Sequence, residues 1–281
     1  MRRVTPKLAA LAVAALFAPV AVASPAHAKP TPDPLTALRK QLTAGGGVTY
    51  TSRTTLRNKR IATTTGAFRF GRSGLAASRL STGLRVELPS LRENPLLEAL
   101  PEETVKIGRT AYLRNVELVL RHRERRPWAQ VKDGPATGLY GVLGQLVNPT
   151  EPATLKTLLA QSRSKRPGGV VGGTRTTLYQ GKVTIGRLYR VSPWLRDALL
   201  TKPTPRLAKT TVDWKLYVGA DGLPRRVVSS WSPAALGVTK GRFTADSTFT
   251  RWGRKISIKP PADHEVIQIP KSEIKPPLPV K

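Results

Sequence analysis

The 281-residue sequence contains no cysteine and only three histidines. Without cysteine there is no disulfide framework, no thiolate metal site, no cysteine nucleophile and no N-terminal cysteine to carry a lipid. Acidic residues are also scarce, with 17 Asp and Glu against 47 Lys and Arg, which gives a formal net charge of +30. Such a surplus bears on solubility and partners rather than on fold. Because hydrophobic residues still make up 40% of the chain, we do not expect disorder throughout.

Long apolar runs are missing except at the N-terminus. The first seven residues carry three cations, an Ala/Leu/Val run follows over residues 8–23, and Ala26-His27-Ala28 supplies a small-x-small cleavage pattern. We therefore predict that residues 1–28 are an export signal, which leaves a mature chain with a net charge of +27. No later apolar run approaches the roughly 20 residues that cross a bilayer. We expect the mature protein to be secreted or in the cell envelope, without a lipid anchor.

The remaining sequence predicts a single domain over residues 29–281. Its two ends are rich in proline, at residues 29–33 and from about residue 269 to 281, and we expect the second of these to be a frayed tail. Between the ends, proline and glycine are scattered as turn punctuation, with no linker and no repeat of solenoid period.

Three short segments combine a polar capping residue with a proline at the first helical position, which is typical of helix starts. They are Asp33-Pro34, Asn148-Pro149 and Ser192-Pro193, and leucines follow each at helical spacing. In the second segment Glu151 is placed to reach back as a capping-box partner. The sequence therefore predicts a few amphipathic helices.

Most of the rest alternates apolar with polar residues, the two-residue period of a sheet with one buried face. The alternating segments are Phe68/Phe70, Val105/Ile107, Val183/Ile185, Val212 to Val218 and Ile256/Ile258. In the Val212 to Val218 strand the even-numbered side chains should face inward. Asp221-Gly222 marks a turn, because glycine adopts a positive φ without strain. We expect an α+β protein with helices gathered on one face of a large, curved antiparallel sheet.

The C-terminal run TVDWKLYVGADGLPRRVVSSW, followed by FTRWGRKISIKPPADHEV, resembles actinobacterial cell-envelope proteins related to the LppX and LprG lipoproteins, which belong to the LolA-like superfamily. Upstream, VKIGRTAYLR and RPWAQV are similar to a hairpin of that family with a Tyr and then a Pro-Trp pair. The residues that carry the resemblance most clearly are Trp214, Tyr217, Asp221, Gly222, Pro224, Arg225, Trp252, Gly253, Pro260 and Pro261. Many relatives have a lipid-bearing cysteine, and this chain has none.

The resemblance implies an incomplete β-barrel whose concave face is covered or plugged by helices, with an apolar cavity that receives acyl chains. The alternation itself leaves open whether the inward side chains line such a cavity or pack completely against the helices. The predicted cavity residues are Phe68, Phe70, Val105, Ile107, Trp214, Leu216 and Val218 from strands, with Leu155, Leu158 and Leu159 from a helix that could act as a lid.

The basic surplus also has two interpretations, a uniformly solvated surface or a surface that attracts polyanions. Clustering of the cations favours contact with anionic headgroups or cell-wall polymers. The predicted contact residues are Arg121, Arg123, Arg125, Arg126, Arg225 and Arg226. Nucleic acid is disfavoured as a partner because the chain is exported, has 6% aromatic residues and lacks a recognisable binding motif.

Catalytic patterns are weak. His122 and His264 have no partner nearby in sequence, Ser162-Arg163-Ser164-Lys165 matches S-x-x-K without its companion motifs, and Glu102 and Glu103 would point to opposite faces of a strand. We therefore predict no enzyme, metal or cofactor, but a monomeric binder or carrier of lipids or lipoproteins. The alternatives are an envelope sensor or interaction module resembling the LolA-like anti-sigma regulators, a binder of cell-wall polyanions, and a secreted hydrolase.

Overall fold

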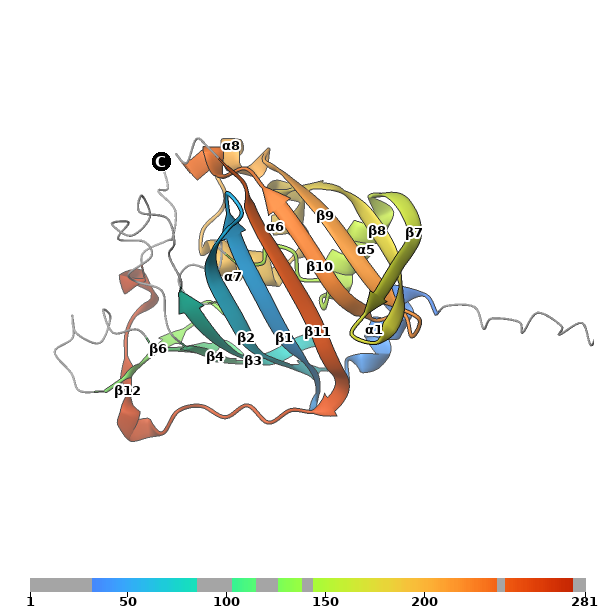
Figure 1. Cartoon of the computed structure of the whole chain (residues 1–281). Coiled ribbons are helices and arrows are strands. Elements are labelled where there is room, and N and C mark those ends of the chain that lie inside the picture. Colours follow the sequence, from blue (N-terminus) through green and yellow to red (C-terminus); the bar gives the residue numbers. More distant parts are fainter. Residues whose placement is uncertain (1–31, 85–102, 115–125, 138–143, 237–240, 275–281) are drawn as a thin grey trace, which may run out of the picture. The chain divides into compact units, whose positions relative to one another are not determined.

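The computed structural model describes residues 32–84, 103–114, 126–137, 144–236 and 241–274, and all structural statements below concern these residues. Their twelve strands form one sheet in the order β12-β6-β5-β4-β3-β2-β1-β11-β10-β9-β8-β7 (Figure 1). The strands are β1 (Gly46–Leu56), β2 (Lys59–Gly71), β3 (Gly74–Leu84), β4 (Glu103–Ile107), β5 (Thr110–Arg114), β6 (Trp128–Lys132), β7 (Ser162–Val171), β8 (Thr174–Thr184), β9 (Thr211–Gly219), β10 (Pro224–Trp231), β11 (Phe243–Lys255) and β12 (Val266–Gln268). Every neighbouring pair is antiparallel except β12 with β6.

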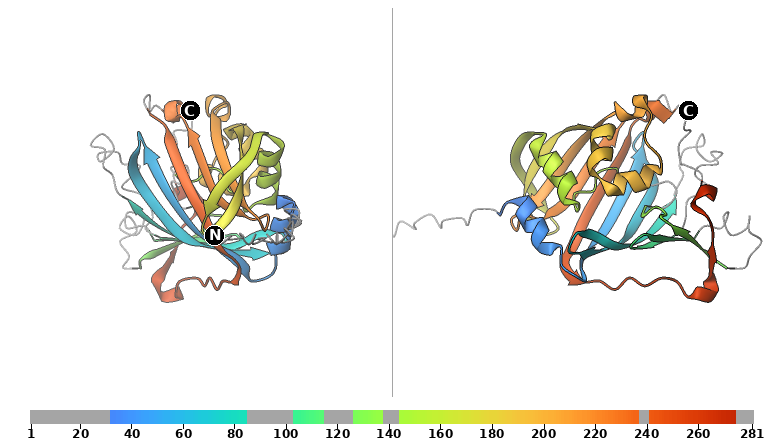
Figure 2. Two further views of the ribbon diagram at one scale, coloured as in Figure 1. Left: turned by 45° about the vertical axis from the view of Figure 1, so that its right-hand side comes forward. Right: turned by 180° about the vertical axis from the view of Figure 1, so that it is seen from behind.

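The helices lie on the concave face of this sheet, which does not close into a barrel (Figure 2). The described residues contain five α-helices, namely α1 (Pro34–Gln41), α5 (Pro152–Ala160), α6 (Ile185–Val191), α7 (Pro193–Leu199) and α8 (Pro205–Ala208). Three short 3-10 helices, η2 (Pro233–Leu236), η3 (Asp263–Glu265) and η4 (Lys271–Glu273), complete the fold. The prediction of an α+β protein with an open, curved antiparallel sheet and helices on one face is confirmed.

Strand β9 shows how the sequence sets the two faces of the sheet. Its residues alternate between buried and more exposed, so Trp214 and Leu216 face the helices while Lys215 faces outward, as the two-residue period predicts. Leu216 lies opposite Val227 of β10, and both belong to the largest hydrophobic cluster, between the sheet and the helices. The turn after β9 has Gly222 at φ +79°, as expected.

Two of the three predicted helix starts are confirmed. Asp33 and Ser192 precede α1 and α7, and each side chain accepts a backbone N–H of its helix. The second prediction is wrong by one turn, because α5 begins at Pro152. The Asn148 side chain instead accepts bonds from the backbone N–H and the hydroxyl of Thr150, a local turn that competes with helix.

Three other segments differ from the sequence predictions. Only Val183 of the Val183/Ile185 pair lies in a strand, because Thr184 caps the N-terminus of α6 by accepting the N–H of Arg187 at 3.2 Å. Helix α8 was not predicted, although Thr204-Pro205 has the same capping signature. Residues 256–258 lie beyond β11, which ends at Lys255.

The C-terminal segment packs on the sheet instead of fraying from residue 269. After β11 it runs past the outer face of the sheet to β12, where Val266 pairs with Trp128 of β6 (Figure 1). Ile269 and Ile274 are then buried with Leu113 and Val131 on the other face. The prediction of a frayed tail is therefore wrong for residues 269–274, because two isoleucines between the prolines supply a buried anchor.

The predicted export signal and the lead-in as far as residue 31 lie outside the described residues, as does the chain after residue 274. In the part of the chain that the structure describes, no helix combines the length and apolar character needed to cross a membrane.

Candidate functional site

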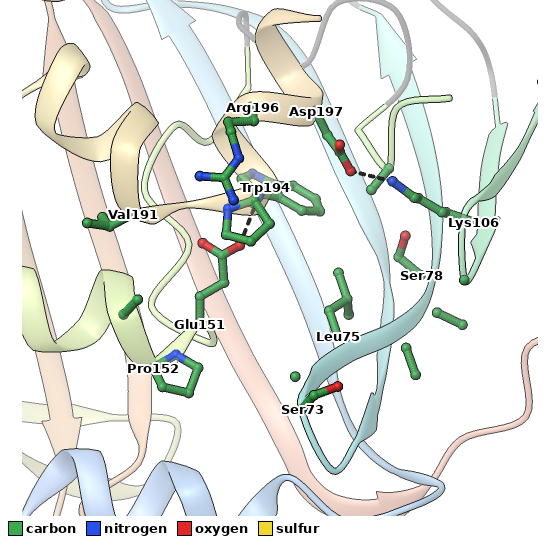
Figure 3. Close-up of a pocket in the computed structure, with 17 residues that line it drawn as sticks. Ser73, Leu75, Ser78, Lys106, Glu151, Pro152, Val191, Trp194, Arg196 and Asp197 are labelled. Carbon is green, nitrogen blue, oxygen red and sulfur yellow. Dashed lines mark hydrogen bonds and ion pairs between the residues drawn. The ribbon is translucent and has the colours of Figure 1, made fainter. Parts of the chain in front are cut away.

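A pocket of about 420 Å³ lies between the helical layer and the sheet, near the N-terminal ends of α5 and α7 (Figure 3). The sheet side is lined by the start of β3 and by Lys106 of β4, and the helical side by the first turns of the two helices. The lining residues are Ser73, Gly74, Leu75, Ala76, Ala77, Ser78, Lys106, Gly108, Ala136, Glu151, Pro152, Ala153, Val191, Pro193, Trp194, Arg196 and Asp197. A volume of this size and a mostly apolar wall with a few polar groups are typical of small-molecule sites.

Small side chains on the sheet create this hollow. The first strand residues of β3 read Gly-Leu-Ala-Ala-Ser from Gly74 to Ser78, whereas β9 presents Trp214 and Leu216 to the same helical layer. A fully buried tryptophan or leucine fills the space that an alanine or serine leaves empty. The sequence therefore places the cavity at β3 and a filled core at β9.

Glu151 joins the two helices that bound the pocket. Its carboxylate accepts the Ser192 hydroxyl at 2.5 Å, the backbone N–H of Trp194 at 2.8 Å and the Thr154 hydroxyl at 2.8 Å. Burial raises the pKa of Glu151, and the three donors counteract part of this effect. Because these bonds connect the start of α5 to the start of α7, Glu151 fixes the spacing of the helical wall.

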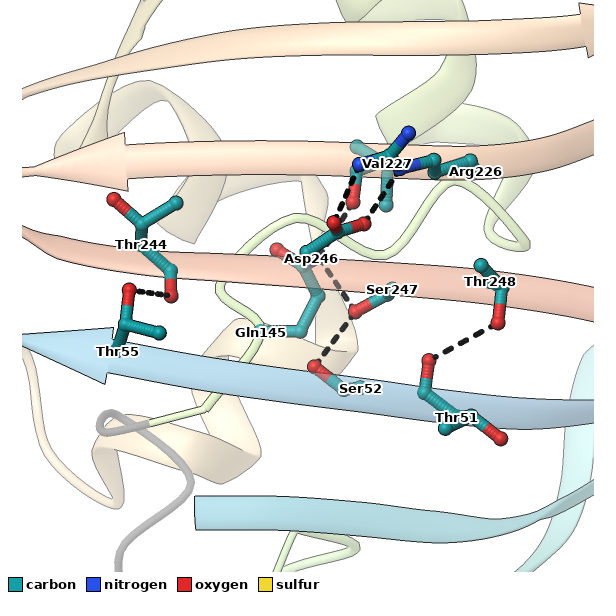
Figure 4. A network of polar contacts seen from close by, with 10 residues as sticks. All are labelled: Thr51, Ser52, Thr55, Gln145, Arg226, Val227, Thr244, Asp246, Ser247 and Thr248. Carbon is teal, nitrogen blue, oxygen red and sulfur yellow. Dashed lines mark hydrogen bonds and ion pairs between the residues drawn. The ribbon is translucent and has the colours of Figure 1, made fainter. Parts of the chain in front are cut away.

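Trp194 is the largest side chain in the pocket wall. Its indole N–H donates to the carbonyl of Gln145 at 2.9 Å, and its ring meets the edge of Phe68 with centroids 5.3 Å apart. Gln145 in turn belongs to a buried network that fixes it against the sheet (Figure 4). The tryptophan is therefore held on both sides before any ligand enters.

The buried network lies at the centre of the sheet. Gln145 donates to Ser247 at 2.8 Å and accepts from Ser229 at 2.6 Å, and Ser247 donates to Ser52 at 2.8 Å. These residues come from β1, β10, β11 and the segment before α5, so the network ties that segment to three strands (Figure 4). Each hydroxyl is satisfied, which a buried polar group requires.

Ser78 and Lys106 are the polar groups on the sheet side of the pocket. They are directly opposite one another in the pairing of β3 with β4. Lys106 donates to Asp197 of α7 at 2.5 Å, an ion pair that bridges sheet and helix. Ser78 is fully buried, and its hydroxyl has no hydrogen-bond partner among the residues that the structure describes.

The structure places the predicted cavity residues mostly in a filled core. Leu159 packs at the edge of the main cluster, and Val105 and Ile107 belong to a different cluster with Ile258. The buried members of the main cluster are Phe68, Phe70, Leu155, Leu158, Trp214, Leu216 and Val218. None of the ten lines the pocket between α5, α7 and β3.

The prediction that Val105 and Ile107 share one face with Phe68 is wrong. In β4 the side chains that face the helices are Thr104 and Lys106, opposite Leu80 and Ser78. The apolar residues of this strand point to the outer face, where the C-terminal segment covers them. The alternation of apolar and polar residues correctly indicated that the apolar residues of β4 are covered. It could not show on which face they lie, because both faces of this strand are covered by other parts of the chain.

Sequence reasoning missed most of the pocket residues. Ser78, Lys106, Asp197 and Arg196 carry no motif, and only Glu151 was singled out, as a helix-cap partner. In the sequence Lys106 alternates with Val105 and Ile107, so the two-residue period predicts that it faces outward and gives no signal of its place in the pocket.

The predicted anion-contacting residues are largely engaged within the chain. Arg225 forms an ion pair with Asp221, and Arg226 binds both oxygens of Asp246, at 2.7 and 2.5 Å. Arg126 donates to the carbonyl of Val266 at 3.0 Å. The other three predicted contacts, Arg121, Arg123 and Arg125, lie outside the described residues.

The weak catalytic patterns do not come together. Ser162 lies in β7, where its hydroxyl donates to the Ser164 carbonyl at 2.9 Å. His264 is exposed in η3, and Glu103 pairs with Arg79. His122 and Glu102 lie outside the described residues. Within the ranges that the structure describes, no three His, Asp or Glu residues form a group that could hold a metal ion.

The geometry defines a class of protein, an open antiparallel half-barrel with a helical layer and a pocket between them. No family model matches the sequence, and no curated protein matches it. Among solved structures, the chain is similar in fold to LprF from Mycobacterium bovis, with 14% sequence identity and a TM-score of 0.45. The match covers 82% of this chain and 95% of the LprF chain.

Proposed function

We propose that this protein is an exported, non-enzymatic binder or carrier that takes an acyl-bearing ligand, a lipid or a lipoprotein, into the pocket between α5, α7 and β3. The observation that carries the proposal is the pocket itself, about 420 Å³ with walls that include Leu75, Ala136, Val191 and Trp194. Ligand pockets in proteins span about 300–1,000 Å³. The export pattern and the lack of cysteine support action outside the cytoplasmic membrane without a lipid anchor.

Apolar burial supplies the affinity in this proposal. Each methylene that leaves water contributes about 0.8 kcal/mol, so a chain of eight methylenes contributes about 6 kcal/mol before the costs of association. The wall needs no rearrangement to receive it, because Glu151 and Gln145 already hold the helices and Trp194 in place.

The polar groups of the pocket support binding rather than catalysis. Glu151 is occupied by three donors from its own chain, and Lys106 donates to Asp197. Ser78 makes no hydrogen bond to a base, which an activated serine nucleophile requires.

A blocking substitution tests the proposal. Ala153 is an exposed pocket-lining residue of α5, whereas Ala160 is exposed at the other end of the same helix, outside the pocket. We expect a fluorescent fatty acid to bind the wild type saturably and Ala153→Trp to weaken that binding about tenfold or more, a loss of roughly 1.4 kcal/mol. Ala160→Trp is the matched control and should bind as the wild type does.

Two results would contradict the proposal. If the folded wild type binds no acyl probe, the protein is not an acyl carrier and the interaction-module alternative takes its place. If both tryptophan variants bind the probe as the wild type does, the acyl site lies elsewhere.

We also propose that the protein attracts anionic lipid surfaces through the β7–β8 hairpin. Residues 162–184 contain five cations and no carboxylate. Lys182 pairs with Asp213, and Lys165 lies over the Tyr179 ring, whereas Arg163, Arg166 and Arg175 form no ion pair with any residue that the structure describes. Near the tip of the hairpin, Val170 is 67% exposed.

Vesicle binding tests this second proposal. Each Lys or Arg near an anionic membrane contributes about 1 kcal/mol, so Arg166→Glu with Arg175→Glu should weaken binding to phosphatidylglycerol vesicles by about tenfold or more. Arg53→Glu with Lys59→Glu is the control, since both residues are exposed on β1 and β2 and the change in net charge is equal. Equal losses in both variants would show that only net charge matters, and binding to soluble polyanions alone would favour a cell-wall polymer.

A further inference from the structure

Ser78 has a buried hydroxyl without a partner at the wall of the pocket. The residue is 0% exposed and is one of those that line the pocket from the sheet side (Figure 3). On the same face of the sheet, Ser52, Ser229 and Ser247 are all hydrogen-bonded. An unsatisfied buried hydroxyl is costly, so its presence at a cavity indicates a bond that a ligand completes.

Lys106 provides a second donor beside it. Residues directly opposite each other on antiparallel strands have Cβ atoms about 4.5–5.5 Å apart, and Ser78 is opposite Lys106. The ammonium group has three N–H donors, and the bond to Asp197 uses one of them. Because Asp197 binds the ammonium group, its charge is held between β4 and α7 at the wall of the pocket.

Other polar groups of the pocket make bonds within the chain. Glu151 accepts three bonds from its own chain, and Asp197 accepts from Lys106. Arg196, the other cation of the wall, donates to the carbonyls of Tyr189 and Arg190 through one guanidinium nitrogen. Ser78 and Lys106, opposite each other on β3 and β4, offer a ligand a pair of donors from the sheet side.

We infer that the pocket recognises the carbonyl or carboxylate end of its acyl ligand, with the Ser78 hydroxyl and the Lys106 ammonium as donors. The inference rests on the proposed acyl-binding function and names the chemistry by which the pocket chooses its ligand. The apolar chain then lies along the apolar part of the wall, which includes Leu75, Val191 and Trp194.

A ligand series with one chain length tests this inference. Decanoate, methyl decanoate and decane share an alkyl chain and differ in the hydrogen-bond acceptor at its end. Competition against the fluorescent fatty acid gives the affinity of each, and the differences measure how much the polar end contributes to binding. We expect decanoate to bind most tightly and decane most weakly, with about tenfold or more between them, since hydrogen bonds that involve a charged group are worth about 1.5–3 kcal/mol.

Two variants assign the donors. Ser78→Ala should weaken decanoate and the ester about fivefold and leave decane unchanged, because one neutral hydrogen bond is worth about 1 kcal/mol. Lys106→Met combined with Asp197→Asn removes the ion pair without leaving an unpaired charge, and it should abolish the preference for the acid over the ester. Ser81→Ala, an exposed position on the same strand, is the control.

The outcomes separate this inference from the proposed function. Equal affinities for the three ligands in the wild type, or a decanoate preference that survives in both variants, would overturn the assignment of the donors while acyl binding stands. Failure of the wild type to bind any of the three ligands or the probe would overturn the proposed function itself.

Discussion

The inner face of the sheet has a filled half and a hollow half. In the filled half, β9 to β11 contribute Trp214, Leu216, Val227 and Phe249, each at most 2% exposed. In the hollow half, β3 and β4 contribute alanine, Ser78 and Lys106, and the pocket lies above them. Both halves have the same two-residue period, so the period identifies the inward face while the volume of the inward side chains decides where a cavity forms.

The two halves also treat buried serines differently. Ser247 is bonded to Gln145 and Ser52 in the filled half, whereas Ser78 has no partner in the hollow half. Both side chains are 0% exposed. The buried serines of the network are bonded to one another or to Gln145, whereas the serine at the pocket is left open, as a position that recognises a ligand would be.

The largest expected difference between the two halves is the loss of folding stability when a leucine in each is replaced by alanine. Leu216→Ala removes a fully buried side chain from the filled half and should lower the free energy of unfolding by about 2–5 kcal/mol. Leu75→Ala acts on a partly buried side chain that already borders empty space, and it should cost about 1 kcal/mol. Urea denaturation with an unchanged m-value measures both.

Equal costs for the two leucines would show that the hollow half is as tightly packed as the other half. Leu216→Arg is not a useful probe of ligand binding, although the alternation of β9 places Leu216 on the inner face, where it was predicted to line a cavity. Because Leu216 lies in the filled core, a buried arginine there should prevent folding rather than block a cavity.

Much of the fold could be predicted from sequence because local chemistry determines it. Asp33 and Ser192 cap helices through their own side chains, and β9 alternates because one of its faces is covered. Asn148 also looks like a cap, but its side chain bonds to Thr150 two residues later and delays the helix. The competition between a cap and a turn depends on neighbours that a capping pattern does not include.

The pocket could not be predicted in the same way. Its polar pair comes from two strands whose register is fixed only in the folded sheet, and Asp197 reaches Lys106 from a helix 91 residues further along the chain. The family resemblance suggested a cavity, but it placed that cavity along the large apolar residues. The pocket between α5, α7 and β3 lies instead beside the small side chains at the start of β3, with Trp194 in its wall.

The two buried serines give the smallest and sharpest test of the comparison. Ser247→Ala should lower the free energy of unfolding by about 1–3 kcal/mol, because Gln145 and Ser52 each lose a partner inside the core. Ser78→Ala should raise the stability of the ligand-free protein by up to about 1 kcal/mol, because it removes a hydroxyl that has no partner. Decanoate should reverse the order of stability, so that the wild type becomes more stable than Ser78→Ala. A ligand stabilises the native state according to its affinity, and the alanine variant binds decanoate less tightly. Thermal unfolding with and without decanoate measures both serines, and a loss of stability in ligand-free Ser78→Ala equal to that of Ser247→Ala would show that Ser78 is already satisfied within the folded chain.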